Sequence, residues 1–209
     1  MKPPLPEPLP ADPLPLVAEW LAEAQQAMRN ATSMTLATVE PDGRPSARMV
    51  ICRGFDPDAG WLVFYTDRNS RKGRALEHCP RAALVFHWDM FERQIRIEGP
   101  VTFAPDEDSD RYWSSRPPDA RIAAIASDQS EPIASRAELS AKVEESARRF
   151  GPEPPRPARW GGYRVWAERV ELWVGQPARL HDREQWVRTL SVHGAGFAGS
   201  PWTGTRLQP

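Results

Sequence analysis

Residues 64–72 place hydroxyl and cationic side chains together directly after an apolar, strand-like pattern. The segment reads FYTDRNSRK. Hydroxyls donate hydrogen bonds, arginine supplies a planar donor fork and lysine a compact charge, so a cluster of anionic oxygens can be met from several directions. The segment therefore predicts a phosphate-binding turn. A solvated turn between two elements is the alternative, because it would have a similar composition.

The overall charge restricts anion binding to local sites. The formal net charge is -1 and the pI is near 6.4, which argues against a protein drawn to nucleic acid or to an anionic membrane. Residues 48–74 are a local exception, with six cations against three anions. The cations are Arg48, Arg53, Arg68, Arg71, Lys72 and Arg74.

Two further pairs of residues suggest anion contacts. Tyr112 and Arg116 lie four apart at the end of an expected helix, so they share one face and form a second candidate anion site. The alternative is an arginine that is simply favoured by the helix dipole. Arg48 and Arg53 face opposite sides by strand alternation unless a bulge intervenes, and each is open to interpretation as a surface charge.

Near the C-terminal end, an extended chain would direct Arg179, His181 and Arg183 to one side. Three such groups repel one another unless an anion or an electron-rich ring lies between them, and a solvated surface is the alternative. The aromatic and glycine-rich segment 160–163 and Trp173 would allow a flat ligand to approach closely. Core packing is the more common role of tryptophan.

The hydrophobic periodicity predicts an α+β, mainly β fold with helices around a barrel-like antiparallel sheet. A Pro-Asp-Gly turn between two β-rich runs indicates a hairpin. Gln94, Arg96 and Glu98 alternate with Ile95 and Ile97, so one face of that strand is wet, ligand-lined or at an interface. The expected strands span 34–39, 46–52, 60–65, 82–88, 93–99 with 101–103, and 163–173, and the expected helices span 13–29, 70–78, 107–115, 120–127 and 135–150.

The length of 209 residues fits a single domain over residues 12–209, after a proline-rich segment, residues 1–11, that is extended or disordered. Cys52 and Cys79 form no CxxC pair and the histidines show no metal-ligand spacing with them, so buried reduced thiols and no metal are expected. The absence of a signal-like or membrane-length apolar stretch predicts a soluble cytoplasmic protein. The glycines of segment 192–200 predict a mobile loop.

Taken in order, these stretches resemble the pyridoxine (pyridoxamine) 5′-phosphate oxidase family over about residues 11–209. No single stretch is specific, whereas the ordered set at family-like spacing is. The resemblance is carried by Arg48–Val50, Phe64–Thr66, Ser70–Lys72, Glu92–Gln94, Tyr112, Ser115–Pro117, Gln129–Ser130, Trp160–Tyr163, Glu171–Trp173, Arg179–Arg183 and Arg206–Pro209.

The resemblance implies a split β-barrel and a homodimer with an FMN in each of two clefts at the subunit interface. It implies that Arg53, Tyr112 and Arg116 bind the phosphate of a vitamin B6 substrate. Arg179 and His181 would lie over the pyridine ring of that substrate as the catalytic pair. The flavin would be held by Arg48, Tyr65, Thr66, Ser70, Arg71, Lys72, Gln94, Gln129, Ser130, Trp173 and Arg183.

The implied reaction removes two electrons from C4′ of pyridoxamine or pyridoxine 5′-phosphate, formally as hydride to flavin N5. Molecular oxygen then reoxidises the flavin, which gives pyridoxal 5′-phosphate, hydrogen peroxide and, from the amine, ammonia. The protein would contribute the placement of C4′ and a suitable electrostatic field. In this hypothesis Arg179 pins and polarises the ring, while His181 manages protons around C4′.

Two positions depart from the family pattern. Arg53 stands where members commonly have lysine, a change that keeps the charge. Ala120 stands where they commonly have serine, and the lost hydroxyl bond would weaken phosphate binding by roughly 1.5–3 kcal/mol unless water or Arg121 replaces it. Two alternatives follow: a flavin oxidase of the same fold on another substrate, as in phenazine biosynthesis, and a non-catalytic carrier or sensor of FMN or pyridoxal phosphate.

Overall fold

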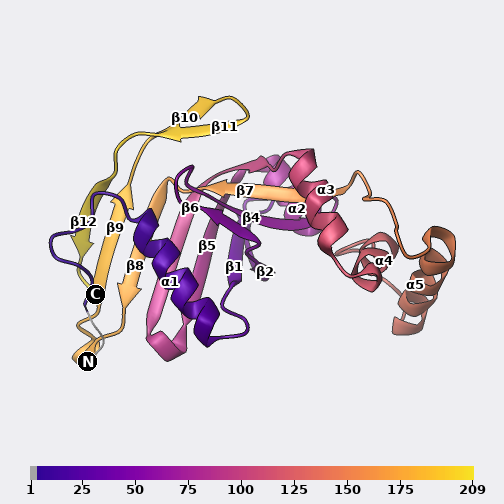
Figure 1. Cartoon of the computed structure of the whole chain (residues 1–209), viewed down its shortest axis with the longest axis horizontal. Coiled ribbons are helices and arrows are strands. Elements are labelled where there is room, and N and C mark those ends of the chain that lie inside the picture. The colour runs from indigo at the N-terminus through magenta and orange to yellow at the C-terminus, as the bar shows by residue number, and fades with distance from the viewer. Residues whose placement is uncertain (1–3) are drawn as a thin grey trace.

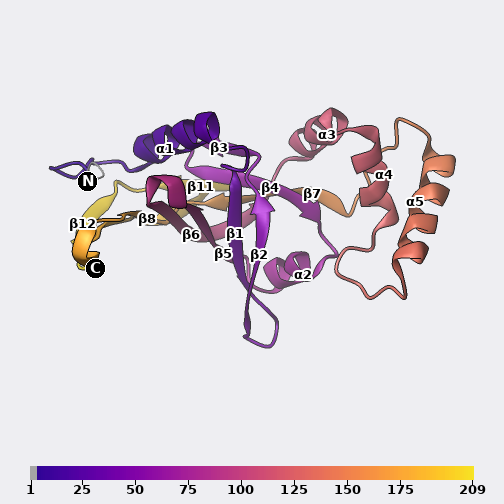
Figure 2. The same cartoon turned by 90° about the horizontal axis from the view of Figure 1, so that it is seen from below.

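The structure, a computed structural model, describes residues 4–209 and consists of a curled antiparallel sheet with helices on both sides and at one end (Figure 1, Figure 2). The helices lie where the sequence predicts them, with each end within two residues of the expected one. Within the described residues the α-helices are α1 (Leu14–Ala27), α2 (Arg71–His78), α3 (Asp106–Ser115), α4 (Pro118–Ala126) and α5 (Arg136–Phe150).

The sheet curls because one long strand belongs to both of its halves. The strand β6 (Arg93–Phe103) pairs with β5 and β8 through its first residues and with β7 through its last three. This sharing produces a split barrel and confirms the expected mainly β, α+β fold. The other strands are β1 (Ser33–Val39), β2 (Pro45–Ile51), β3 (Gly54–Asp56), β4 (Trp61–Asp67), β5 (Arg81–Trp88), β7 (Trp160–Trp166), β8 (Arg169–Val174), β9 (Asp182–Val187), β10 (Leu190–His193), β11 (Gly196–Gly199) and β12 (Thr203–Leu207).

The hydrophobic core lies between the sheet and α1. The helix buries one stripe of residues against the sheet, and Ile95 and Ile97 of β6 are fully buried on the facing side. Burial of each such side chain contributes roughly 1.5–3 kcal/mol. Gln94, Arg96 and Glu98 lie on the other face and are only half-buried, which confirms the alternation read from the sequence.

The single strand expected over residues 163–173 is in fact two strands, β7 and β8. β7 pairs with β4, whereas β8 pairs with the beginning of β6, so the chain crosses between the two halves of the barrel at Ala167 and Glu168. A Cβ at Gly99 would overlap the carbonyl oxygen of Trp166, so glycine permits the close backbone approach at this crossing. Strand alternation cannot reveal a change of partner strand, which explains the error.

The segment 192–200, expected to be a mobile loop, forms most of the hairpin β10–β11. Phe197 packs edge-on against Trp166 with ring centroids 5.8 Å apart, which attaches the hairpin to β7. The strands β9 and β12, which the sequence did not indicate, pair with each other and extend the sheet beyond β8. In segment 192–200, tertiary packing against Trp166 thus produces a hairpin where the glycine-rich composition predicts a loop.

The N-terminal prediction covers residues 1–11, of which the first three lie outside the described residues. Residues 4–11 contain neither helix nor strand. Leu5 is buried in the core, and the indole Nε1 of Trp186 donates to the carbonyl oxygen of Pro10 at 2.8 Å. The segment therefore packs along the barrel beside β9.

Both cysteines are free thiols. Cys52 is buried, and burial raises its pKa to about 11, whereas Cys79 is only half-buried, so the expected burial holds for Cys52 alone. In residues 4–209 no group of His, Cys, Asp and Glu is arranged to hold a metal ion. No helix of the same residues has the length and hydropathy needed to cross a membrane.

Candidate active site

The turn after β4 and the first residues of α2 form a site suited to an anion. Ser70 is fully buried, and its hydroxyl donates to the carbonyl oxygen of Asp67 at 2.7 Å and caps the N-terminus of α2. A Cβ at Gly73 would overlap the backbone of the turn, so glycine allows the helix to begin close against it. The first turn of α2 has no acidic residue, so its positive dipole end adds to the charges of Arg71 and Lys72.

The ammonium of Lys72 lies at the centre of this site. Its Nζ donates to Gln129 Oε1 at 2.7 Å, to Thr66 Oγ1 at 3.1 Å and to Ser70 Oγ at 3.2 Å. Burial, together with the nearby charge of Arg48, lowers the pKa of Lys72 to about 8. A desolvated ammonium with neutral hydrogen-bond partners gains more from a bound phosphate than a solvated one does.

Two arginines extend the positive charge beside Lys72. Arg48 donates to the hydroxyls of Thr38 and Ser46, both at 2.7 Å, and lies 3.8 Å from Glu40. Arg71 Nε lies 3.1 Å from the same buried carboxylate. The cluster therefore has an excess of positive charge, and Glu40 orients both guanidinium groups. Sequence reasoning missed Glu40, because an acid just before a turn is usually solvated.

A second cationic group is supported by stacked aromatic rings. Tyr65 and Tyr112 stack with ring centroids 4.2 Å apart, and Trp160 lies nearly parallel to both rings. The guanidinium carbon of Arg116 is 4.9 Å from the centroid of Trp160, and that of Arg53 is 5.5 Å from the centroid of Tyr112. Nη1 of Arg116 is buried and has no hydrogen-bond partner. Burial also lowers the pKa of Arg116, so this group too is suited to an anion.

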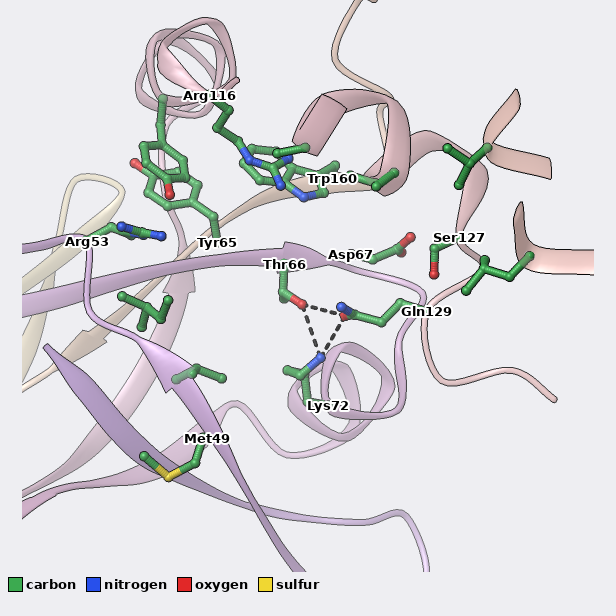
Figure 3. Close-up of a pocket in the computed structure, with 18 residues that line it drawn as sticks. Met49, Arg53, Tyr65, Thr66, Asp67, Lys72, Arg116, Ser127, Gln129 and Trp160 are labelled. Carbon is green, nitrogen blue, oxygen red and sulfur yellow. Dashed lines mark hydrogen bonds between the residues drawn. The ribbon is translucent and has the colours of Figure 1, made fainter. Parts of the chain in front are cut away.

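A cavity of about 640 Å³ joins the two cationic groups (Figure 3). Its wall on the side of α4 and α5 is apolar and contains Ala120, Leu139 and Val143. Asp67, Ser127 and Trp160 also face the cavity. Trp160 belongs to the segment 160–163 that was expected to allow a flat ligand to approach, whereas no separate role was predicted for Asp67 or Ser127. Of the predicted site residues, the cavity brings together Arg53, Tyr65, Thr66, Lys72, Tyr112, Arg116 and Gln129.

Other residues of this region lie beside the cavity rather than in its wall. Arg48, Ser70 and Arg71 form the adjoining cationic cluster, and Ser130 is exposed in the next loop with a φ of 76°. Arg121 donates to the carbonyl oxygen of Pro152 at 3.2 Å and does not line the cavity. It is therefore not placed to replace a hydroxyl at position 120.

The remaining predicted flavin residues form a row on the sheet. Gln94 of β6 is paired with Trp173 of β8, which is paired with Arg183 of β9. All three are partly exposed, and none lines the cavity. Arg183 is oriented by the buried Glu171, whose Oε1 accepts from its Nε at 3.1 Å and from its Nη2 at 2.9 Å. Figure 1 shows β8 and β9 far from α3 and α4.

The two predicted catalytic residues lie near this row. The ring centroid of His181 is 4.7 Å from that of Trp173, and its Nδ1 accepts from the backbone N–H of Gln176 at 3.2 Å. Arg179 is exposed at the end of a 3-10 turn, Pro177–Arg179, with a φ of 61°. The prediction of an extended chain through Arg179 is therefore wrong, because Pro177 begins a turn and β9 starts only at Asp182.

Comparisons with known proteins identify the family. Residues 21–149 match the family described as pyridoxamine 5′-phosphate oxidase. The chain belongs to this family. Residues 160–209 match its companion region, described as the pyridoxine 5′-phosphate oxidase C-terminal dimerisation region. The resemblance read from the sequence is thereby confirmed.

Relatives cover nearly the whole chain. Pyridoxine/pyridoxamine 5′-phosphate oxidases of Burkholderia mallei and Burkholderia thailandensis are each 48% identical over 191 residues, which covers 91% of this chain and 86% of theirs. The crystal structure of PhzG from Burkholderia lata 383, in complex with tetrahydrophenazine-1-carboxylic acid, is 32% identical with a TM-score of 0.85 and covers 97% of this chain and 95% of that one. An FMN-binding protein from Nostoc punctiforme, 21% identical with a TM-score of 0.71 over 93% and 96% of the two chains, shares the fold.

The two regions of the pyridoxamine 5′-phosphate oxidase family separate the two groups of site residues. All cavity residues except Trp160 lie in the first matched region. Trp173, Arg179, His181 and Arg183 lie in the second, the region described by its role in dimerisation. Gln94 of the row lies in the first region, so the boundary between the two matched regions follows the two groups except at Trp160 and Gln94.

Proposed function

We propose that this chain is an FMN-dependent oxidase that converts pyridoxamine 5′-phosphate and pyridoxine 5′-phosphate to pyridoxal 5′-phosphate. The observation that carries the proposal is the pair of separate cationic sites on one cavity. One surrounds Lys72, and the other contains Arg116, whose buried Nη1 has no partner. Two anion sites on one cavity, the second of them beside stacked aromatic rings, suit a phosphorylated cofactor next to a phosphorylated ring substrate.

The residues around Lys72 fit the phosphate of FMN. Ser70, Arg71, Lys72 and Arg48 would hold it together with the N-terminus of α2, while Tyr65, Thr66, Gln129 and Ser130 would bind the rest of the flavin from the same side. The desolvated Lys72 supports this assignment, because a bound dianion restores the stabilisation that its ammonium lost on burial. When bound, FMN supplies the two-electron acceptor that takes electrons from C4′ and passes them to O2.

The functional unit we propose is a homodimer with the flavin at the subunit interface. The row formed by Gln94, Trp173 and Arg183 is on a partly exposed sheet face, and most of it belongs to the region matched as a dimerisation region. In a two-fold dimer each row can face the cavity of the other subunit. Each of the two sites would then be built from both chains.

The substrate phosphate would bind to Arg53, Tyr112 and Arg116, and this fixes the ring relative to the flavin. Arg179 would hold the pyridine ring from the other side, and its exposure on a turn leaves it free to reach a ligand. His181 would accept or donate the proton exchanged at C4′. For the amine, the balanced reaction consumes O2 and water and releases pyridoxal 5′-phosphate, ammonia and hydrogen peroxide.

A second candidate is an oxidase of the same fold that acts on a reduced tricyclic carboxylic acid. The TM-score of 0.85 with PhzG favours it, as does the apolar cavity wall that contains Ala120, Leu139 and Val143. A carboxylate needs fewer donors than a phosphate, so a missing serine hydroxyl would matter less. The retained Tyr112 and Arg116 favour the vitamin B6 substrate.

The test is turnover of each substrate by the FMN-loaded protein. We expect pyridoxamine 5′-phosphate to bleach the flavin without oxygen, and in air to yield equal amounts of pyridoxal 5′-phosphate and hydrogen peroxide. Bleaching by tetrahydrophenazine-1-carboxylic acid alone would support the second candidate. A flavin that is bound but reduced by neither compound would indicate a non-catalytic binder and would overturn both proposals.

A further inference from the structure

The helices α4 and α5 stand apart from the barrel and have little apolar attachment to it (Figure 2). α5 buries none of its side chains, and α4 buries only Ile122 and Ala126. The pair packs chiefly on itself, yet it contributes Ala120, Leu139 and Val143 to the cavity wall. Something other than hydrophobic burial must therefore fix these helices relative to the site.

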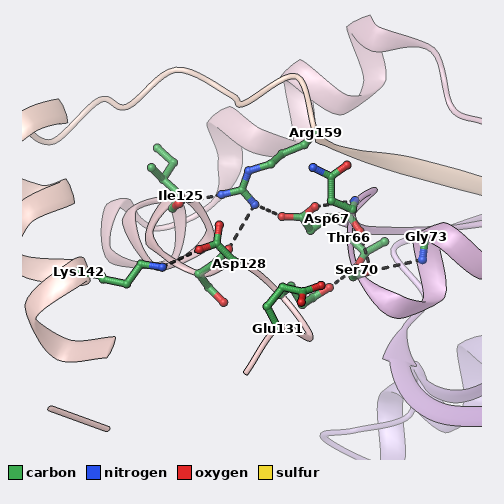
Figure 4. A network of polar contacts seen from close by, with 12 residues as sticks. Thr66, Asp67, Ser70, Gly73, Ile125, Asp128, Glu131, Lys142 and Arg159 are labelled. Carbon is green, nitrogen blue, oxygen red and sulfur yellow. Dashed lines mark hydrogen bonds and ion pairs between the residues drawn. The ribbon is translucent and has the colours of Figure 1, made fainter. Parts of the chain in front are cut away.

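The side chain of Arg159 makes this connection (Figure 4). It lies just before β7, and its Nη1 forms an ion pair with the carboxylate of Asp67 at the end of β4. Nη2 donates to the carbonyl oxygen of Ile125 at 2.8 Å, and Nη1 donates to that of Ser127 at 3.2 Å. These are carbonyls of the last turn of α4 and its C-cap, which lack helical partners and carry the negative end of the helix dipole. One guanidinium thus joins a sheet carboxylate to a helix end.

The residues that follow these carbonyls reach the cationic site. Gln129 Oε1 accepts from Lys72 Nζ at 2.7 Å and from Thr66 Oγ1 at 2.8 Å. Glu131 then pairs with Arg74 of α2 at 2.8 Å. The position of Gln129 therefore depends on where α4 ends, and Arg159 fixes that end.

We propose that Arg159, held by Asp67, is a positioning residue that sets the end of α4 and so places Gln129 against Lys72. This inference rests on the proposed function in one respect, namely that the phosphate of FMN binds at Lys72. The side chain of Asp67 is only 4% exposed, so its carboxylate is desolvated and needs the positive charge of Arg159 beside it. A charged hydrogen-bonded pair of this kind tolerates little change in geometry. Arg159 does not line the cavity, although Asp67 does, so Arg159 acts through Gln129 rather than on the ligand.

Arg156 provides a matched control on the same connector. It is even less exposed than Arg159, and it pairs with Asp106 at 3.1 Å and with Asp110 at 2.6 Å. Both carboxylates belong to α3 rather than to α4. Arg156→Met therefore removes a half-buried arginine, its ion pairs and its 2.8 Å bond to the carbonyl oxygen of Trp160, without releasing the end of α4.

The experiment compares Arg159→Met, Arg159→Lys, Asp67→Asn and Arg156→Met in two measurements. The first is hydrogen exchange of residues 125–131 in the flavin-free protein, which does not depend on the proposed function. The second is the rate of FMN dissociation, followed by the recovery of flavin fluorescence. We expect Arg159→Met to raise exchange in 125–131 and to speed FMN release by on the order of tenfold, in line with the loss of charged hydrogen bonds.

The conservative variants separate positioning from general stability. Arg159→Lys keeps the charge beside Asp67 but cannot make all three bonds. It should therefore raise exchange in 125–131 and the rate of FMN release less than Arg159→Met does. Asp67→Asn is isosteric and should reproduce the faster release if Arg159→Met fails to fold. Arg156→Met should leave exchange in 125–131 and FMN release within about twofold of wild type.

Two results would overturn the inference. Unchanged exchange in residues 125–131 for both Arg159→Met and Asp67→Asn would show that the pair does not set the end of α4. Equal acceleration of FMN release by Arg156→Met would show a general loss of stability. A wild-type protein that binds no FMN, but whose 125–131 exchange rises in Arg159→Met, would refute the proposed function and leave the positioning role intact.

Discussion

The two groups of site residues differ in how much of a site one chain builds. Around Lys72 and Arg116, side chains from β4, α2, α3 and the loop after α4 enclose one cavity, and hydrogen bonds fix several donors in advance. On β6, β8 and β9, Gln94, Trp173 and Arg183 form a row on a sheet face and are partly exposed. The cavity can therefore select a ligand by its own shape, whereas we expect the row to act only opposite another subunit.

The most direct way to break this comparison is complementation between chains. Lys72→Met removes the central ammonium of the cavity and Arg183→Met removes a cation of the row, so each variant alone should lose nearly all activity. After both are unfolded, mixed and refolded, a mixed dimer has one site with both changes and one with neither. Random pairing then restores about a quarter of wild-type pyridoxal 5′-phosphate formation.

A second mixture supplies the control for complementation. Lys72→Met and Arg116→Met both alter the cavity, so no site of their mixed dimer is intact and activity should stay near zero. Failure of the first mixture to recover, with both variants folded and dimeric, would mean that each site lies within one chain. The distinction drawn between the two groups would then be wrong.

The parts of the site that were predictable from sequence are those built within a few consecutive residues. The turn around Ser70 and the pair of Tyr112 and Arg116 each lie within about one turn of helix, so spacing alone brings their groups together. The helices and most strands were predictable for the same reason. Local periodicity carries enough information to place them.

The remaining features depend on contacts between distant segments. Trp160 stacks on rings from β4 and α3, Arg159 reaches from just before β7 to the end of α4, and Glu40 after β1 meets Arg71 of α2. No spacing rule specifies such meetings before the topology is known. The division of segment 163–173 into two strands was unpredictable for the same reason. The residue pattern of one continuous strand continues where the neighbouring strand in the sheet changes.

The cavity side of the comparison is sharpened by a change at its second anion site. Arg116→Met removes the guanidinium with the unpaired Nη1, while methionine can still pack near Trp160. We expect KM for pyridoxamine 5′-phosphate to rise on the order of tenfold to a hundredfold, with FMN affinity nearly unchanged. Steady-state kinetics with flavin fluorescence titration measures both quantities.

Arg121→Met is the matched control, because Arg121 is nearby but donates to Pro152 instead of lining the cavity. Its KM should remain within about twofold of wild type. An equal rise in KM for both variants would show a diffuse charge effect rather than a defined phosphate site.

The row is tested by the residue that holds it in order. Glu171 is 4% exposed as a side chain and bonds Arg183 through Oε1 and Arg96 through Oε2. In Glu171→Gln the amide has only one acceptor oxygen, so one arginine loses its partner. We expect FMN affinity to fall on the order of tenfold and thermal stability to drop.

Glu98→Gln separates these effects, since Glu98 also pairs with Arg96, at 2.6 Å, but does not contact Arg183. It should lower stability slightly and leave FMN affinity within about twofold of wild type. Isothermal titration with FMN and thermal melts of the flavin-free protein compare the two variants. If Glu98→Gln weakens FMN binding as strongly as Glu171→Gln, orientation of Arg183 is not the cause.

The pH dependence of flavin binding sharpens the role of Lys72. Because burial lowers its pKa to about 8, FMN binding above that pH must be accompanied by uptake of a proton, and affinity should fall by up to roughly tenfold per pH unit. The stability of the flavin-free protein should change in the opposite direction. Between pH 8 and the ordinary lysine pKa of 10.5, the unfolded chain binds more protons than the folded one, so Lys72 favours folding more as pH rises.

Lys72→Arg keeps its charge throughout this range, so its FMN affinity should be nearly constant between about pH 7 and pH 9.5. Fluorescence titrations at several pH values decide the matter. A wild-type affinity that is equally flat would show that the ammonium of Lys72 is not the group that binds the phosphate.

The smallest expected effect concerns the wall where the cavity departs from its family. Ala120 lines the cavity near the start of α4, and Arg121 points away from it, so no side chain there supplies the hydroxyl that family members commonly have. Ala120→Ser should lower KM for pyridoxamine 5′-phosphate by roughly twofold to tenfold, because the serine hydroxyl adds a hydrogen bond to the phosphate. The effect is modest, because in the present chain a water molecule can supply part of that hydrogen bonding. Ala123→Ser adds the same hydroxyl one helical turn further along the same wall and should change KM little, because phosphate held at Arg116 lies toward the first turn of the helix. A KM that Ala120→Ser leaves unchanged would mean that the cavity holds its anion without this helix, and would shift the choice of substrate toward the carboxylate of the second candidate.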